Sequence, residues 1–110
     1  AHNYASSLLD LQRFKETKAL LRKTIPVARR VLGDNDILTF QMRKAYAQSL
    51  YLDADATLDD LHEALTALEE TERVAKRVLG GAHPDVAGIR NSLRLSREVL
   101  DARETPSGNA

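Results

Sequence analysis

An internal repeat limits the folds open to this chain. Residues 28–33, Ala-Arg-Arg-Val-Leu-Gly, recur 47 positions later at 75–80 as Ala-Lys-Arg-Val-Leu-Gly. A second match, 42 positions apart, relates 4–8 to 46–50, so that about five extra residues fall near 53–57. Repeats of this length are typical of helical arrays, in which each unit buries its apolar face against the next. We therefore expect a chain built from stacked units of one kind.

Each unit is predicted to form two helices. Between Leu58 and Leu79 the apolar residues recur every three or four positions, which places them on one face of an α-helix and does not fit the alternation of a strand. Two helices are expected to end at Gly33 and Gly80, because glycine adopts the left-handed closing conformation and the basic residues before it suit the negative end of the helix dipole. The predicted helices span residues 2–12, 14–32, 36–53, 58–79 and 84–103.

Short polar residues and prolines indicate where these helices begin. Aspartate, asparagine and threonine accept hydrogen bonds from the amides of a first helical turn, and proline suits the first position because it has no amide to satisfy. The expected start signals are Asp34 or Asn35 for the third helix, Thr57 with Asp60 as a capping box for the fourth, and His83 with Pro84 for the fifth. Pro26 is the exception, since inside a helix it costs about 3 kcal/mol, and we expect a kink or a break there.

Composition and charge exclude several classes of function. At 110 residues and 43% apolar content the chain suits one small domain. It carries 16 Lys and Arg against 16 Asp and Glu, so no net field favours phosphate backbones or anionic lipids, and we expect neither nucleic acid nor membrane as a partner. Cysteine is absent, which removes disulfides and thiolate zinc sites, and no run approaches the roughly 18 apolar residues of a membrane span. We expect a cytoplasmic domain.

Two stretches resemble metal sites, but neither is complete. Residues 53–57 resemble the opening of a calcium loop, yet Leu58 stands where that loop requires glycine. His62-Glu63 opens like a zinc-protease helix, yet the second histidine is replaced by Thr66. The sequence also has no glycine-rich phosphate loop and no nucleophile elbow. We therefore expect no metal, no cofactor and no catalytic residues, and do not expect an enzyme.

The connections between the units resemble those of kinesin light chain-like tetratricopeptide repeats. Residues 79–87, Leu-Gly-Gly-Ala-His-Pro-Asp-Val-Ala, follow the family's pattern closely, and residues 32–39 follow it loosely. The resemblance covers residues 3 to about 100, and it departs at the insertion, at the internal proline, and at Arg94, where a small residue is usual. Because a long cation there would obstruct a further helix, we expect the last helix to end the stack.

This resemblance implies an all-α fold: a right-handed α-solenoid of antiparallel helix hairpins, with about two and a half repeats and five helices. The domain would span residues 1–103, and a disordered tail would span 104–110.

The resemblance also implies a non-catalytic scaffold for protein–protein interaction. Such repeats bind a peptide or a helix of a partner protein in a concave groove, which the first helix of each hairpin lines. In this groove the side-chain amides of glutamine and asparagine would form hydrogen bonds with a peptide backbone, and Tyr51 and Leu95 would be apolar anchors. Carrying over the family's groove positions gives His2, Ser6, Leu9, Asp10, Gln41, Lys44, Gln48, Tyr51, Asn91, Leu95 and Glu98.

The alternative function is a structural or oligomerising helical segment of a larger protein. The chain starts without an initiator methionine or a helix cap, which favours a fragment. On this hypothesis Tyr4, Leu8 and Leu11 pack on an upstream repeat or on a second copy in a homodimer. The leucines of 58–68 have coiled-coil spacing, but Glu72 interrupts the series, so packing in a core explains them better.

Overall fold

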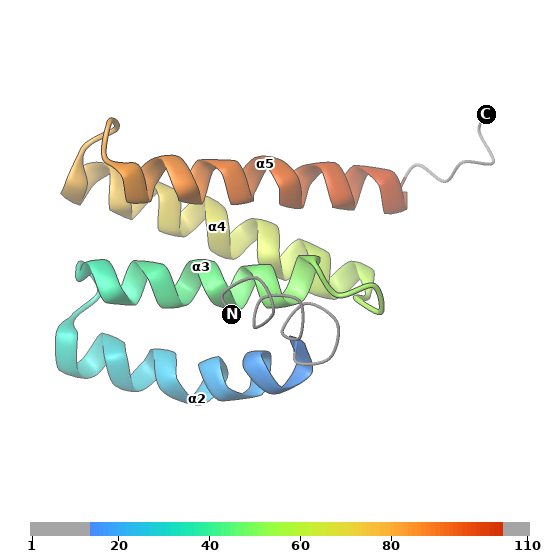
Figure 1. The fold of residues 1–110 in the computed structure, drawn as a ribbon, viewed down its shortest axis with the longest axis horizontal. Helices are drawn as coiled ribbons and strands as arrows, with labels where there is room; N and C mark the ends of the chain where they lie inside the picture. The colour runs from blue at the N-terminus through green and yellow to red at the C-terminus, as the bar shows by residue number, and fades with distance from the viewer. Residues whose placement is uncertain (1–13, 105–110) are drawn as a thin grey trace, which may run out of the picture.

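The computed structural model describes residues 14–104. This part of the chain forms four helices and contains no strand: α2 (Phe14–Leu32), α3 (Ile37–Tyr51), α4 (Leu58–Leu79) and α5 (Pro84–Glu104). Consecutive helices run antiparallel, so that α2 and α4 share one direction and α3 and α5 the other (Figure 1). The prediction of packed helix hairpins is confirmed. The helix predicted at 2–12 lies outside the described residues, and the right-handed solenoid stays a prediction.

The helix boundaries agree closely with the sequence. α2 and α4 have the predicted bounds, whereas α3 begins one residue later and ends two residues earlier than predicted. Glu104, which the sequence assigns to the tail, is the last residue of α5. The rest of that tail, 105–110, lies outside the described residues.

The start of α3 differs from the prediction because Asp34 has another partner. Arg29 Nε donates a hydrogen bond to Asp34 Oδ1, which ties the residue after Gly33 to the end of α2. This hydrogen bond lowers the pKa of the Asp34 carboxyl. The cap is Asp36, whose Oδ1 accepts a hydrogen bond from the Leu38 amide at 2.8 Å. The expected cap at residue 34 or 35 is therefore wrong.

α4 begins with the predicted capping box. Thr57 Oγ1 accepts a hydrogen bond from the Asp60 amide, and Asp60 Oδ2 accepts one from the Thr57 amide, both at 3.1 Å. The hydrogen bond from the Thr57 amide lowers the pKa of the Asp60 carboxyl. The charged carboxylate thus stabilises the first turn of α4.

α5 holds the inserted loop between α3 and α4. Within the loop, Asp53 Oδ1 accepts a hydrogen bond from the Asp55 amide at 2.9 Å, which makes an Asx turn. From the far end of α5, Arg103 donates to the carbonyl oxygens of Ala56 at 2.6 Å and Ala54 at 3.0 Å. The extra residues are therefore fixed by a turn of their own and by one distant side chain.

The two repeated segments end in the same way. Gly33 has a φ of +94° and Gly80 a φ of +92°, values that side chains disfavour. Their amides donate to the carbonyl oxygens of Arg29 and Lys76, at 3.0 and 2.9 Å, and so close the last helical turns. The equivalence of the two helix ends, expected from the repeat, is confirmed.

α2 continues through Pro26 without interruption. The alternative of a break is wrong. Proline removes one helical hydrogen bond and its ring disturbs the turn before it, but the helix is held against the rest of the fold on either side of this residue. Ala28 of α2 is buried, and Leu21 and Ile25 are half-buried.

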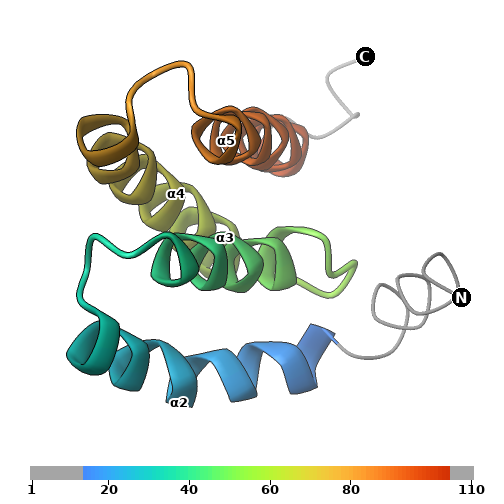
Figure 2. The same cartoon turned by 60° about the vertical axis from the view of Figure 1, so that its left-hand side comes forward.

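α3 lies at the centre of the fold, in contact with α2, α4 and α5. Its side chains Phe40, Ala47 and Leu50 are buried and share one core with Leu68 of α4 and Ile89 of α5. Figure 2 shows α5 stacked on α3, with α4 beside them and α2 beyond α3. The first helices of successive hairpins, α3 and α5, therefore lie side by side.

Candidate protein-binding face

Polar side chains connect α3 and α5 across the face that the two helices form, here called the α3–α5 face. Gln41 Nε2 donates to Asp85 Oδ1 at 3.5 Å, and two turns later Gln48 Nε2 donates to Ser92 Oγ at 3.2 Å. Both pairs are separated by 44 residues in the chain. Because α3 and α5 run in the same direction, this constant spacing places the two glutamines in one row along the face.

Lys44 lies in the same row, between the two glutamines, opposite Gly88 of α5. Its Nζ is 3.1 Å from the position that a Cβ on Gly88 would take, so the missing side chain there makes room for the ammonium. The lysine is half-buried, and among residues 14–104 it has no ion pair. A narrow depression surrounds it, lined by Phe40, Gln41, Lys44, Asp85 and Ile89.

The two expected apolar anchors are less exposed than the sequence indicates. Tyr51 is 3% exposed and belongs to the core. Leu95 is half-buried and packs against that core. Leu95 thus offers some apolar surface to a ligand, whereas Tyr51 supports α3 from within.

On α5, the predicted residues Asn91 and Glu98 share one partner. Arg94 Nη2 donates to Asn91 Oδ1, and Arg94 Nη1 donates to Glu98 Oε2 at 3.1 Å. All three side chains are exposed. The sequence assigned Arg94 only to the end of the stack, although its spacing of four residues from Glu98 indicates this ion pair.

The structure therefore brings Gln41, Lys44 and Gln48 into one row, with Asn91, Leu95 and Glu98 along α5. The other four predicted residues, His2, Ser6, Leu9 and Asp10, lie outside the described residues.

The described residues also bear on the other sequence motifs. His83 Nδ1 accepts a hydrogen bond from the Asp85 amide at 3.1 Å, so its expected role at the start of α5 is confirmed. Between residues 14 and 104, no three His, Cys, Asp or Glu side chains are grouped so that they could hold a metal ion. No helix in that range is both long and apolar enough to cross a bilayer. Hydrogen bonding is the chemistry that the α3–α5 face offers.

A comparison with models of known protein families identifies the family of this chain. Residues 1–37 and 53–85, which together are more than half of the chain, match the family model of the tetratricopeptide repeat. The chain belongs to the tetratricopeptide repeat family. Its repeats are of the kinesin light chain-like type. Tetratricopeptide repeats generally mediate protein–protein interaction and are typically not catalytic. No curated protein and no solved structure matches the chain significantly.

Proposed function

We propose that this tetratricopeptide repeat domain binds a peptide or a helix of another protein along the α3–α5 face. The proposal rests on the position of Lys44. It lies between Gln41 and Gln48, is half-buried, and has no ion pair among the described residues. An ammonium has three donors, so a carbonyl or carboxylate oxygen of a ligand can accept a hydrogen bond from it.

Partial burial strengthens such a contact. A charge that is partly removed from water interacts more strongly with an opposite charge, because the surrounding dielectric constant is lower. The neighbouring amides, Gln41 and Gln48, can exchange their bonds to Asp85 and Ser92 for bonds to a peptide backbone. The polar groups then select the ligand more than they add affinity, and Leu95 supplies apolar contact.

The test is a selection from a random peptide display library on the immobilised full chain. Peptides that bind the wild type are assayed again on Lys44→Glu and on the control Lys23→Glu, which makes the same charge change on an exposed lysine of α2. We expect Lys44→Glu to weaken the bound peptides by about tenfold or more, as loss of a charged hydrogen bond does, and Lys23→Glu to leave them unchanged. Equal effects of the two variants would refute the proposal.

A second variant fills the space that the Lys44 ammonium occupies and leaves the charge of the lysine unchanged. In Gly88→Ala the new Cβ would meet Lys44 Nζ at 3.1 Å, so the flexible lysine must move. We expect weaker binding with an unchanged circular dichroism spectrum. Tyr51→Ala is unsuitable, because truncating a residue that is 3% exposed changes stability as well as the face.

Self-association is a second candidate function, and a stripe on α2 favours it. Leu20, Val27 and Val31 are 63%, 45% and 71% exposed and lie on one side of the helix. A second copy of the chain could cover this stripe. Sedimentation velocity over a hundredfold range of concentration should then show a dimer that Val31→Lys abolishes. A constant sedimentation coefficient of the wild type would exclude this function.

A further inference from the structure

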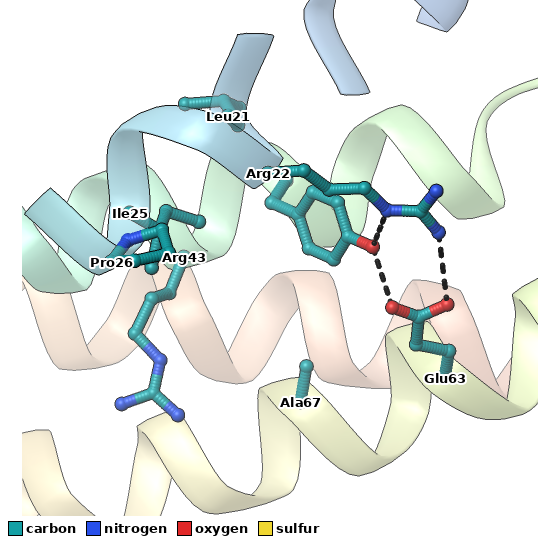
Figure 3. A pocket seen from close by; sticks show the side chains of 8 residues that line it. Leu21, Arg22, Ile25, Pro26, Arg43, Glu63 and Ala67 are labelled. Carbon is teal, nitrogen blue, oxygen red and sulfur yellow. Dashed lines mark hydrogen bonds and ion pairs between the residues drawn. The ribbon is translucent and has the colours of Figure 1, made fainter. Parts of the chain in front are cut away.

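A second cleft lies between α2 and α4, where α3 forms its floor. It is an open cleft with a volume of about 340 Å³, and its accessible wall is mostly apolar. Figure 3 shows the labelled residues of α2 and α4 on opposite sides of it; the lining consists of Leu21, Arg22, Ile25, Pro26, Arg43, Tyr46, Glu63 and Ala67. A volume of this size suffices for a large apolar side chain.

One end of the cleft is closed by charges that neutralise each other. Arg22 Nε donates to Tyr46 Oη at 2.9 Å, and the Tyr46 hydroxyl donates to Glu63 Oε2. Arg22 Nη2 also lies 3.7 Å from Glu63 Oε1. Burial and the hydrogen bond to Glu63 raise the pKa of Tyr46. This end therefore offers an incoming ligand no free charge.

The other end is lined by a second ion pair. Arg43, 9% exposed, lies on the floor of the cleft, and its Nη2 donates to Glu70 Oε1. The same guanidinium also lines an adjoining hollow of about 430 Å³, together with Arg29, Asp34, Asn35, Glu70, Val74 and Arg77. The apolar hollow and this second hollow, here called the basic hollow, therefore adjoin each other at Arg43, and together they are called the groove between α2 and α4.

The basic hollow has one cation in excess. Arg29 pairs with Asp34, and Arg43 pairs with Glu70. Arg77 is exposed and has no ion pair within the described part of the chain. The excess charge attracts an anionic group, whereas the carboxylates beside it disfavour a polyanion such as nucleic acid.

Pro26 lies in the wall of the apolar hollow, beside Ile25 of the same helix. Its ring adds to the apolar surface that a ligand side chain can contact.

The distance between the hollows sets the spacing of a ligand's side chains. The lining residues of α4 are centred near residue 65 in the apolar hollow and near residue 74 in the basic one. Nine residues of helix correspond to about 13 Å. An extended peptide rises about 3.3 Å per residue, so about four residues separate the two positions.

We infer that the groove between α2 and α4 is a second docking site, distinct from the α3–α5 face, for an extended acidic peptide. One apolar side chain of that peptide enters the hollow between Ile25 and Ala67. A carboxylate about four residues away meets Arg77.

The experiment is a display selection with counter-selection. A random peptide library is bound to the wild-type chain and then depleted on Arg77→Glu. The recovered peptides should carry an aliphatic or aromatic residue about four positions from Asp or Glu. Their affinity for Arg77→Glu should be lower than their affinity for the wild type by about tenfold or more. Replacing the acidic residue of such a peptide with lysine should restore binding to Arg77→Glu and weaken binding to the wild type.

Two further variants separate this site from the α3–α5 face. Ala67→Arg fills the apolar hollow and should abolish binding of the same peptides, whereas Lys44→Glu should not affect it. Backbone NMR shifts on adding the peptide should lie at Arg43, Val74 and Arg77. Recovered peptides that lose affinity with Lys44→Glu and keep it with Ala67→Arg would overturn the inference while supporting the other site. Recovered peptides without acidic residues would overturn it as well.

Discussion

Replacing Gly80 with alanine tests the helix ends on which the repeat depends. Gly80 has φ +92° and ψ 152°, a region that is essentially restricted to glycine. A Cβ built there has no atom within 4 Å, so crowding contributes nothing and the whole cost is backbone strain. Strain of this kind costs about 1–3 kcal/mol. At about 4–8 °C per kcal/mol for a domain of this size, we expect Tm to fall by about 4–24 °C.

The neighbouring glycine is the matched control. Gly81 has no positive φ, and a Cβ there would make ordinary contacts at 3.5 Å with Arg90 and 3.9 Å with Lys76. Gly81→Ala should therefore change the free energy of unfolding by less than about 1 kcal/mol. Thermal unfolding followed at 222 nm measures both variants, and Gly33→Ala should resemble Gly80→Ala. If alanine at 80 and at 81 had the same effect, the account of these helix ends would be wrong.

Other predictions concern polar groups. Ser96→Ala should raise the free energy of unfolding by up to about 1 kcal/mol in urea titrations, because the buried hydroxyl has no hydrogen-bond partner among the described residues. Thr57→Ala should lower it by about 1 kcal/mol, since it removes half of the capping box. The pKa of Asp60 is lowered from 3.8, so its stabilisation is present above that pH and lost as the pH falls below it; Asp60→Asn should flatten the acid side of a plot of stability against pH. The pKa of Tyr46 is raised from 10.0, so its contribution is present below that pH and lost as the pH rises above it; Tyr46→Phe should remove this loss.

Most of the fold follows from local sequence signals. The capping box of α4 and the closing glycines involve residues that are neighbours in the chain, and both were predictable from their spacing. The cap of α3 was not, because the choice between Asp34 and Asp36 depends on the side chain of Arg29, which takes the first carboxylate. Contacts that depend on how the helices are arranged in space cannot be predicted from a local sequence pattern.

The candidate α3–α5 face was predictable only in part. The positions carried over from the family include Lys44 and Gln48, and both lie opposite α5 in the structure. These positions did not show that Tyr51 is buried, because its exposure depends on the helices around α3. The groove between α2 and α4 combines three helices and a proline that the sequence marked only as a defect, so nothing in the repeat pattern indicated it.

Arg43 and Lys44 are consecutive in α3, yet one lines the groove between α2 and α4 and the other reaches over Gly88 of α5. A single helix thus forms a thin partition between two surfaces. If both surfaces bind ligands as proposed, a ligand that shifts α3 at one surface would change the affinity of the other, and linkage would require an equal effect in both directions. Two partners of this domain would then be coupled without contacting each other.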